Sequence, residues 1–229
     1  MANMKIPDDT QTICVVDDDE GFRDSLVWLL QAAGHRVASF ASGEGFLSHW
    51  RPETPGCLLV DIRMPGMTGL ELQVELERRG YGAPVIFITG HGDVPMAVSA
   101  LRNGAFHFLE KPFNDESMLA IVEQALAVDR QRRRSQAHRA EVVARVEKLT
   151  PREREVMNCV IAGKLNKVTA DELGVSIKTV EAHRSQLMRK LEVDSTAALI
   201  RLLLEPSAEP VDATIPDAEL SSPTKGFPQ

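Results

Sequence analysis

The sequence lacks the features of a membrane or secreted protein. It contains no run of about 18 apolar residues, so no segment is long enough to span a bilayer as a helix. Its first residues include no apolar stretch of the kind found in secretory signals, and we therefore expect a cytoplasmic protein without a membrane partner. The chain has only three cysteines, with no CxxC or His/Cys spacing, which excludes a disulfide framework and a zinc ribbon.

Charge is divided unevenly along the chain. Residues 1–128 hold 9 Lys/Arg and 18 Asp/Glu, residues 129–205 hold 16 and 11, and residues 206–229 hold 1 and 4. An acidic first part followed by a basic second part indicates two domains with different partners, and basic domains are common among proteins that bind nucleic acid. Exposed Lys and Arg on helices would give the same balance without any ligand, so charge alone leaves DNA binding open.

Five short apolar runs alternate with amphipathic stretches in the first 128 residues. The runs span 12–16, 36–40, 57–60, 84–89 and 106–109, and several are rich in β-branched residues. Strands that alternate with helices predict an α/β fold, with a five-stranded doubly wound parallel sheet covered by helices on both faces. We expect the flavodoxin-like strand order 2-1-3-4-5.

The rest of the chain is helical in pattern. No Gly or Pro interrupts residues 113–150, which predicts a last sheet-packing helix that runs on as an exposed linker and could break near Ser135. Five of the 13 prolines fall in the last 24 residues, which show no periodicity. We therefore expect an α/β domain over 10–128, a linker helix over 129–148, an all-α domain over 149–205 and a disordered tail over 206–229.

Polar side chains follow four of the predicted strands. Asp17 and Asp18 follow the first, Asp61 the third and Lys111 the fifth, while Thr89 ends the fourth. Because parallel α/β folds bind ligands at the carboxyl ends of their strands, these groups should converge. Clustered carboxylates favour a cation, and Mg²⁺ accepts oxygen ligands together with phosphate. Asp61 would then be a nucleophile that forms an acyl phosphate, although helix capping would explain any one of these acids alone.

The motifs around these residues resemble the receiver domain of two-component response regulators, and the FixJ-type branch in particular. They are VVDD (15–18), DIRMPGMTGLEL (61–72), PVIFITGHGD (84–93) and FHFLEKPF (106–113). The resemblance covers residues 10–128. It also implies a cis peptide before Pro112, a minority state that X-Pro bonds allow.

The resemblance assigns a role to each of the strand-end residues. Asp61 is the implied phosphoacceptor, Thr89 and Lys111 are the implied ligands of the phosphoryl oxygens, and Phe108 matches an aromatic switch position. An Mg²⁺ site is implied at Asp18, Asp61 and the backbone carbonyl of Arg63, with Asp17 acting through water.

A helix-turn-helix pattern lies in residues 149–193. Ala170, Gly174 and Val180 have the spacing of two helices that meet at a tight turn. Thr150 and Glu153 form a predicted capping box, and Ser176 is expected to cap the second helix of the pair. A glycine between two helices is common in any helical bundle, so the spacing alone leaves DNA binding open.

The whole stretch resembles the LuxR/NarL-type DNA-binding domain. That family has four helices, expected here at about 151–162, 166–173, 177–192 and 195–204, of which the third enters the major groove. Its exposed side is expected to carry Lys178, Arg184, Arg189 and Lys190. The implied base-facing positions are Glu181, Ala182 and Ser185. The implied phosphate-contacting or flanking residues are Lys167, Lys178, Thr179, His183 and Arg184.

Together these patterns predict a transcription regulator that is switched by phosphorylation. Its expected partners are a sensor histidine kinase, double-stranded DNA, RNA polymerase and, on phosphorylation, a second copy of the chain through residues 94–109. One alternative is a haloacid-dehalogenase-like phosphatase, but Arg63 occupies the position where that class needs a second acid. The other is a regulator that binds DNA without phosphorylation. The intact Asp/Thr/Lys set argues against it, and beyond slow self-dephosphorylation we expect no enzymatic activity.

Overall fold

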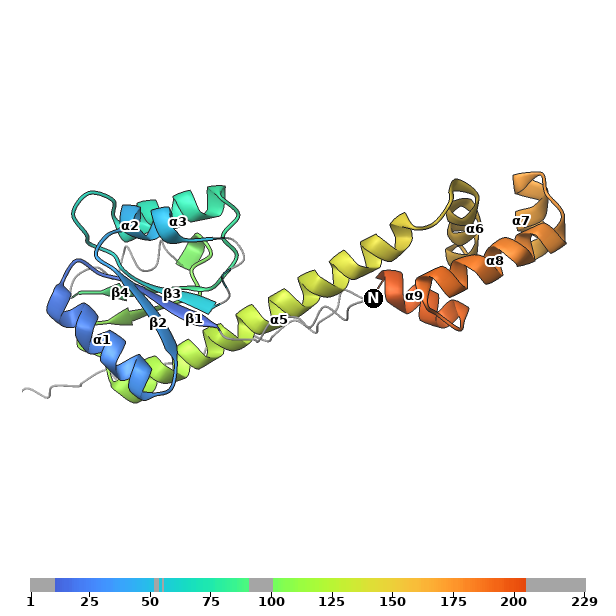
Figure 1. The fold of residues 1–229 in the computed structure, drawn as a ribbon. Helices are drawn as coiled ribbons and strands as arrows, with labels where there is room; N and C mark the ends of the chain where they lie inside the picture. Colours follow the sequence, from blue (N-terminus) through green and yellow to red (C-terminus); the bar gives the residue numbers. More distant parts are fainter. Residues whose placement is uncertain (1–10, 52–53, 55, 91–100, 205–229) are drawn as a thin grey trace, which may run out of the picture.

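The computed structural model describes residues 11–51, 54, 56–90 and 101–204 of the chain. The tail expected over 206–229 and residues 94–100 of the expected dimer face lie outside the described residues. A domain built on a sheet and a smaller helical domain are joined by one long helix (Figure 1). Among the described residues, no helix is both long and apolar enough to cross a membrane.

The first domain contains the predicted sheet. Five parallel strands lie in the order β2-β1-β3-β4-β5, which confirms the expected doubly wound arrangement. They are β1 (Thr12–Val16), β2 (Arg36–Phe40), β3 (Gly56–Asp61), β4 (Val85–Thr89) and β5 (His107–Glu110). Every residue of β3 and β4 is buried, as expected for central strands with helices on both faces.

Two layers of helices cover the sheet (Figure 1). They are α1 (Glu20–Ala32) with the start of α5 (Asp115–Glu147) on one face, and α2 (Gly43–His49) with α3 (Gly69–Arg78) on the other. Successive side chains of a strand point to opposite faces. Ile13 and Val15 therefore pack against α1 and α5, whereas Cys14 and Val16 pack against α2 and α3.

Helix α5 is continuous over 33 residues, about 50 Å at the rise of an α-helix. Its first part is fixed to the sheet by buried side chains such as Met118 and Val122. The expected break near Ser135 does not occur. The segment contains neither Gly nor Pro, so nothing in the backbone interrupts the hydrogen bonds of the helix.

Four helices form the C-terminal domain. They are α6 (Pro151–Ile161), α7 (Asn166–Leu173), α8 (Ile177–Leu191) and α9 (Thr196–Leu204). The predicted capping box of Thr150 and Glu153 is present, and Ser176 caps α8. Gly174 ends α7 with a φ of 65°, a conformation that costs glycine little. Ala170 and Val180 are buried where α7 and α8 meet, as the spacing predicted.

All three cysteines are buried and free. Cys14 and Cys57 lie in β1 and β3, and Cys159 lies in α6. Burial raises the pKa of the Cys14 thiol to about 11 and moves the pKa of Cys57 upward as well.

Candidate functional site

The carboxyl ends of the strands lie together at one edge of the sheet. β3 ends at Asp61 and β4 ends at Thr89, while Asp17 directly follows β1 and Lys111 directly follows β5. Each of these strands is hydrogen-bonded to the next in the order β1-β3-β4-β5. The backbone N–H of Lys111 also donates to the carbonyl of Thr89 at 2.7 Å, so the loop after β5 begins close to the end of β4.

Lys111 joins two buried carboxylates at this edge. Its Nζ donates to Asp61 Oδ1 at 2.8 Å and to Asp17 Oδ2 at 3.0 Å. Asp17 is 1% exposed and Asp61 is 8% exposed, so solvent does little to screen these charges. One ammonium group thus serves two carboxylates that would otherwise repel each other in a partly dehydrated place.

Backbone groups complete the shell around the two carboxylates. The N–H of Arg63 donates to Asp61 Oδ2 at 2.6 Å, and the N–H of Asp19 donates to Asp17 Oδ1 at 2.9 Å. The guanidinium of Arg23 donates to the backbone carbonyl of Asp17 at 2.7 Å. The sequence offered no sign of the Arg23 contact, because it depends on how α1 leaves the end of β1.

This arrangement shifts the pKa values of Asp61 and Lys111. Burial raises the pKa of Asp61, and the hydrogen bond and charge of Lys111 and the N–H of Arg63 offset that effect only in part. Burial alone would lower the pKa of Lys111, but its hydrogen bonds to Asp61 and Asp17 outweigh burial and raise it. The pKa values of Asp61 and Lys111 can both be raised, because Lys111 gains two carboxylate partners whereas Asp61 shares its only cation with Asp17.

Gly69 allows the chain to turn closely behind Asp61. A Cβ atom at this position would lie 2.3 Å from the backbone carbonyl oxygen of Asp61 and 3.1 Å from the ring of Phe87. The N–H of Gly69 instead donates to the carbonyl of Ile62 at 3.0 Å and starts α3 there. A residue without a side chain is therefore needed to hold the loop after β3 against the strand.

The remaining residues expected at this site lie around the pair without a direct bond to it. Asp18 is exposed at the start of the loop after β1. The hydroxyl of Thr89 is fully buried and donates to the carbonyl of Gly90 at 3.1 Å. Phe108 is half-buried in β5 and packs against the core on the α2/α3 side of the sheet.

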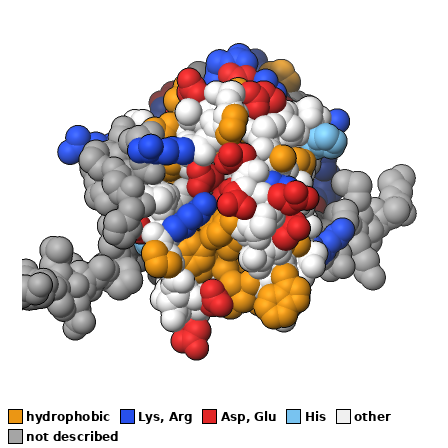
Figure 2. Space-filling view, turned by 90° about the vertical axis from the view of Figure 1, so that its left-hand side faces the viewer, with side chains coloured by type: hydrophobic (Ala, Val, Ile, Leu, Met, Phe, Trp, Pro, Cys, Tyr) orange, Lys and Arg blue, Asp and Glu red, His pale blue; other side chains and the backbone are white. Residues whose placement is uncertain are grey.

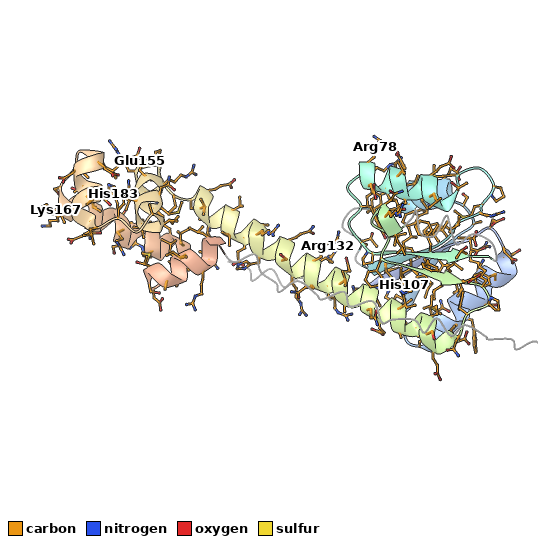
Figure 3. All side chains as sticks on the ribbon, turned by 180° about the vertical axis from the view of Figure 1, so that it is seen from behind. Arg78, His107, Arg132, Glu155, Lys167 and His183 are labelled. Carbon is orange, nitrogen blue, oxygen red and sulfur yellow. The ribbon has the colours of Figure 1, made fainter. Side chains whose placement is uncertain are left out.

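The expected DNA-contacting residues lie on α8 and α7. Lys178, Glu181, Ala182 and Ser185 are exposed on α8 at positions i, i+3, i+4 and i+7, and so they form one stripe along the helix. His183 is half-buried, as is Thr179, whose hydroxyl shares a 2.8 Å hydrogen bond with that of Ser176. Lys167 is exposed on α7 at the outer end of the domain, as Figure 3 shows. Gln186 is also exposed next to the stripe, and the sequence reasoning did not select it.

Both parts of the chain match known proteins. A family model of the response regulator receiver domain matches residues 13–123, and one of bacterial regulatory proteins of the luxR family matches residues 147–203. The transcriptional regulatory protein FixJ of Azorhizobium caulinodans is 42% identical over 202 residues, which are 88% of this chain and 96% of that protein. FixJ of Bradyrhizobium diazoefficiens is 41% identical, over 84% of this chain and 94% of that protein. The structure of the response regulator StyR is 43% identical with a TM-score of 0.79, and the match covers 85% of this chain and 98% of that one.

The chain belongs to the response regulators. It joins a receiver domain to a LuxR-type DNA-binding domain, and proteins with this pair of domains regulate transcription. The first domain is thus a receiver domain, and the haloacid-dehalogenase alternative is set aside. Within the part of the chain that matches the luxR family, α7 and α8 are two helices joined by a short turn that begins at Gly174.

The receiver domain of this response regulator has the donor chemistry for Mg²⁺. Among the described residues, no group of three or more His, Cys, Asp or Glu side chains lies close enough together to hold a metal ion. Mg²⁺ commonly uses only one or two protein carboxylates and keeps several waters. Asp17 and Asp61, which already share a cation in Lys111, fit that requirement, and the exposed Asp18 is adjacent in the chain.

An apolar pocket lies next to the acidic site of the receiver domain. Lys111 Nζ stands 3.8 Å from the ring centroid of Phe22, and the pocket of about 650 Å³ beside it is lined by Phe22, Trp28, Leu29 and Phe113. Trp28 is 71% exposed. Figure 2 looks at this end of the molecule and shows acidic side chains gathered beside a basic one, with an apolar patch next to them.

Two cations expected on the exposed side of α8 are engaged within the DNA-binding domain instead. Arg184 donates to Asn166 Oδ1 at 3.2 Å and to Thr196 Oγ1 at 2.6 Å. Lys190 donates to the buried carboxylate of Glu153 at 2.6 Å. Both residues are partly exposed, and their long side chains fold back from α8 to neighbouring helices. Lys178 and Arg189 are exposed, as expected.

Proposed function

We propose that Asp61 accepts a phosphoryl group from a phosphohistidine of a sensor histidine kinase. The observation that carries this proposal is the hydrogen-bonded set of Asp17, Lys111 and Asp61 at the carboxyl edge of the sheet. An Asp61 carboxylate oxygen bonds to phosphorus while the bond between phosphorus and the imidazole nitrogen breaks, and the nitrogen keeps the electron pair of that bond. The ammonium group of Lys111 then turns to a phosphoryl oxygen as its partner.

Mg²⁺ is the proposed cofactor of this step, held by Asp18, Asp61 and the backbone carbonyl of Arg63, with Asp17 acting through water. When bound, it would supply positive charge next to the phosphoryl oxygens. The fully buried hydroxyl of Thr89 is the proposed second donor to those oxygens, which requires it to leave its bond to the carbonyl of Gly90.

Phosphorylation is proposed to promote dimerisation and DNA binding. Movement of Thr89 toward the phosphoryl group would draw in the loop after β4 and let Phe108 rotate inward, which would alter the surface over 94–109. A population shift of this kind can be no larger than the difference in the phosphoryl group's interaction with the two states. Sedimentation with and without a phosphoryl mimic tests it, and a monomer under both conditions would contradict it.

The DNA-binding domain is proposed to place α8 in the major groove, in a dimer that spans two half-sites about one helical turn apart. The exposed stripe of Lys178, Glu181, Ala182 and Ser185 supports this orientation. The proposed contacts also include the flanking residues Lys167, Thr179, His183 and Arg184. The proposed division of the chain is a receiver domain over 10–128, a linker over 129–148 and a DNA-binding domain over 149–205. The whole chain is proposed to act in the cytoplasm, with RNA polymerase as a further partner.

A labelling experiment tests the phosphoacceptor. Asp61→Asn should abolish Mg²⁺-dependent labelling by acetyl phosphate or by a phosphorylated kinase. Glu77→Gln removes an exposed carboxylate near the end of α3, away from the acidic site, and should leave labelling unchanged. Labelling of Asp61→Asn at the full rate would move the acceptor elsewhere, and a chain that binds its operator equally well without any labelling would be a regulator independent of phosphorylation.

A further inference from the structure

The linker helix is fastened to the base of the receiver domain by a buried carboxylate. Asp129 of α5 is fully buried, and it lies at the end of the sheet opposite to Asp61. Its Oδ2 accepts from the backbone N–H of Gly56 at 2.9 Å and from Gln11 Nε2 at 3.0 Å, and its Oδ1 accepts from Arg132 at 3.0 Å. This carboxylate therefore ties α5 to the start of β3 and to the residue before β1.

Neighbouring side chains prevent α5 from turning about its axis at this point. Gln11 Nε2 also donates to the carbonyl of Leu126 at 2.8 Å, and Arg130 donates to Gln11 Oε1 at 2.6 Å. The guanidinium of Arg132 lies against the backbone of Gly82, in the space that a Cβ atom would occupy there. Arg132 is labelled in Figure 3, where α5 leaves the receiver domain. These contacts join one face of α5 to three separate segments of the receiver domain, at Gln11, Gly56 and Gly82, and so fix the rotation of the helix as well as its position.

A second fastening lies at the other end of the same helix. Arg145 of α5 donates to the carbonyl of Leu191, the last residue of α8, at 3.1 Å, and forms an ion pair with Glu192 at 3.2 Å. Lys190 Nζ donates to the carbonyl of Lys148 at 3.2 Å. The carbonyl groups at the end of a helix have no partner within it, so Arg145 fills a position that α8 leaves open.

The backbone at this junction departs from its ordinary range. Glu192 has a φ of 58°, and it is the only non-glycine residue in the described part of the chain with a positive φ. Residues other than glycine persist in this conformation only where the surroundings over-determine it. The contact between Glu192 and Arg145 is one such constraint, and it comes from the linker helix rather than from the DNA-binding domain.

We propose that α5 acts as a rigid arm that sets the rotational position of α8 relative to the receiver domain, with Asp129 and Arg145 as its positioning residues. The role of this arm in regulation rests on the proposed function, in which phosphorylation controls DNA binding. Each residue of an α-helix turns the chain by about 100°. The number of residues in the arm therefore determines the direction in which α8 faces. We call this rotational angle the phase of the arm, and we expect it to matter more than the length of the arm in ångströms.

Insertions between the two fastenings test the phase. Two alanines inserted after Ala137, which is exposed, turn the DNA-binding domain by about 200°, whereas seven residues turn it by about 700°, within about 20° of two full turns. The probe is an operator selected from random DNA with the phosphorylated chain. Phosphorylation should raise the operator affinity of the two-residue variant at least tenfold less than it raises that of the parent chain. The seven-residue variant should keep most of the parent's increase. Equal behaviour of the two insertions, in either direction, would overturn the proposal.

A distance measurement tests the rigidity without phosphorylation. Spin labels at the exposed positions 24 on α1 and 158 on α6 of the full chain should give one narrow distance distribution. Arg145→Gln should broaden it. Arg139→Gln, which removes an equal charge from an exposed position of the same helix, should not. A broad distribution in the parent chain, or no change in Arg145→Gln, would overturn the arm. Failure of the proposed function would appear separately, as absence of labelling at Asp61.

Discussion

Replacing Gly69 with alanine should disturb the phosphoacceptor while keeping every charged group of the site. The added methyl group would lie 2.3 Å from the backbone carbonyl oxygen of Asp61, about 1 Å closer than ordinary van der Waals contact. The atom in the way belongs to the backbone of a central strand, so it cannot rotate aside as the end of a side chain would. Either the start of α3 or the end of β3 has to move.

The expected loss is in the upper half of the range for overpacked sites, about 2–3 kcal/mol in the free energy of unfolding. For a domain of this size, each kcal/mol lowers the melting temperature by about 3–6 °C. The effect on chemistry should be larger in proportion, because a displacement of about 1 Å of a reacting group can slow a reaction by about a hundredfold. We expect labelling of Asp61 by acetyl phosphate to slow at least about tenfold.

Thermal melting and the initial rate of labelling measure the two effects. Gly21→Ala is the matched control, since Gly21 also lies in the first turn of a helix beside the site. Its Cβ atom would meet only Asp19 Oδ1, at an ordinary 3.5 Å, so alanine should be neutral or stabilise α1 by up to about 1 kcal/mol. If Gly69→Ala melted with the control and labelled at the full rate, the close approach behind Asp61 would not matter.

Four further outcomes concern the DNA-binding domain. Lys190→Met should lower the free energy of unfolding of the DNA-binding domain by about 3 kcal/mol, measured by urea titration, because it leaves the buried carboxylate of Glu153 without its cation. The control Arg189→Met changes an exposed residue and should have no such effect. Burial alone would raise the pKa of Glu153, but its hydrogen bonds with Lys190 and the start of α6 outweigh burial and lower it. The stabilisation from Glu153 is therefore present above its unfolded pKa of about 4.3 and lost as the pH falls through its folded pKa, which a melting series across acidic pH should detect. Glu181→Ala should change operator preference by about 1–3 kcal/mol per altered contact, whereas Arg184→Met should weaken binding to operator and scrambled DNA alike and also lower the melting temperature.

The sequence allowed the sheet and the members of its acidic edge to be predicted. Short β-branched runs bounded by polar residues mark strands locally, and all five runs are strands within one or two residues of their expected bounds. The convergence of Asp17, Asp61 and Lys111 follows from a general property of parallel sheets, whose strands end at the same edge. The capping residues of α6 and α8 were also predictable, because a cap depends on a few adjacent residues.

Contacts between distant elements could not be predicted in the same way. Helical periodicity gives the direction in which Arg184 and Lys190 leave α8, but not that their side chains bend back to α7, α9 and α6. The need for glycine at position 69 arises from the approach of α3 to β3, which no local pattern contains. The continuation of α5 into the linker was predictable, because residues 113–150 contain neither Gly nor Pro, and only the possible break near Ser135 is absent.

The burial of all three thiols leaves the described surface without an exposed thiol. Alkylating reagents and disulfide exchange require the thiolate, and a thiol with a pKa of about 11, as for Cys14, is ionised in about one molecule in ten thousand at pH 7. Cys57 is 1% exposed and Cys159 is 8% exposed, so neither offers a reagent much surface. A cysteine introduced at an exposed position of the folded chain should therefore react alone. Oxidants that act on exposed thiols should leave its cysteines unmodified until the chain unfolds.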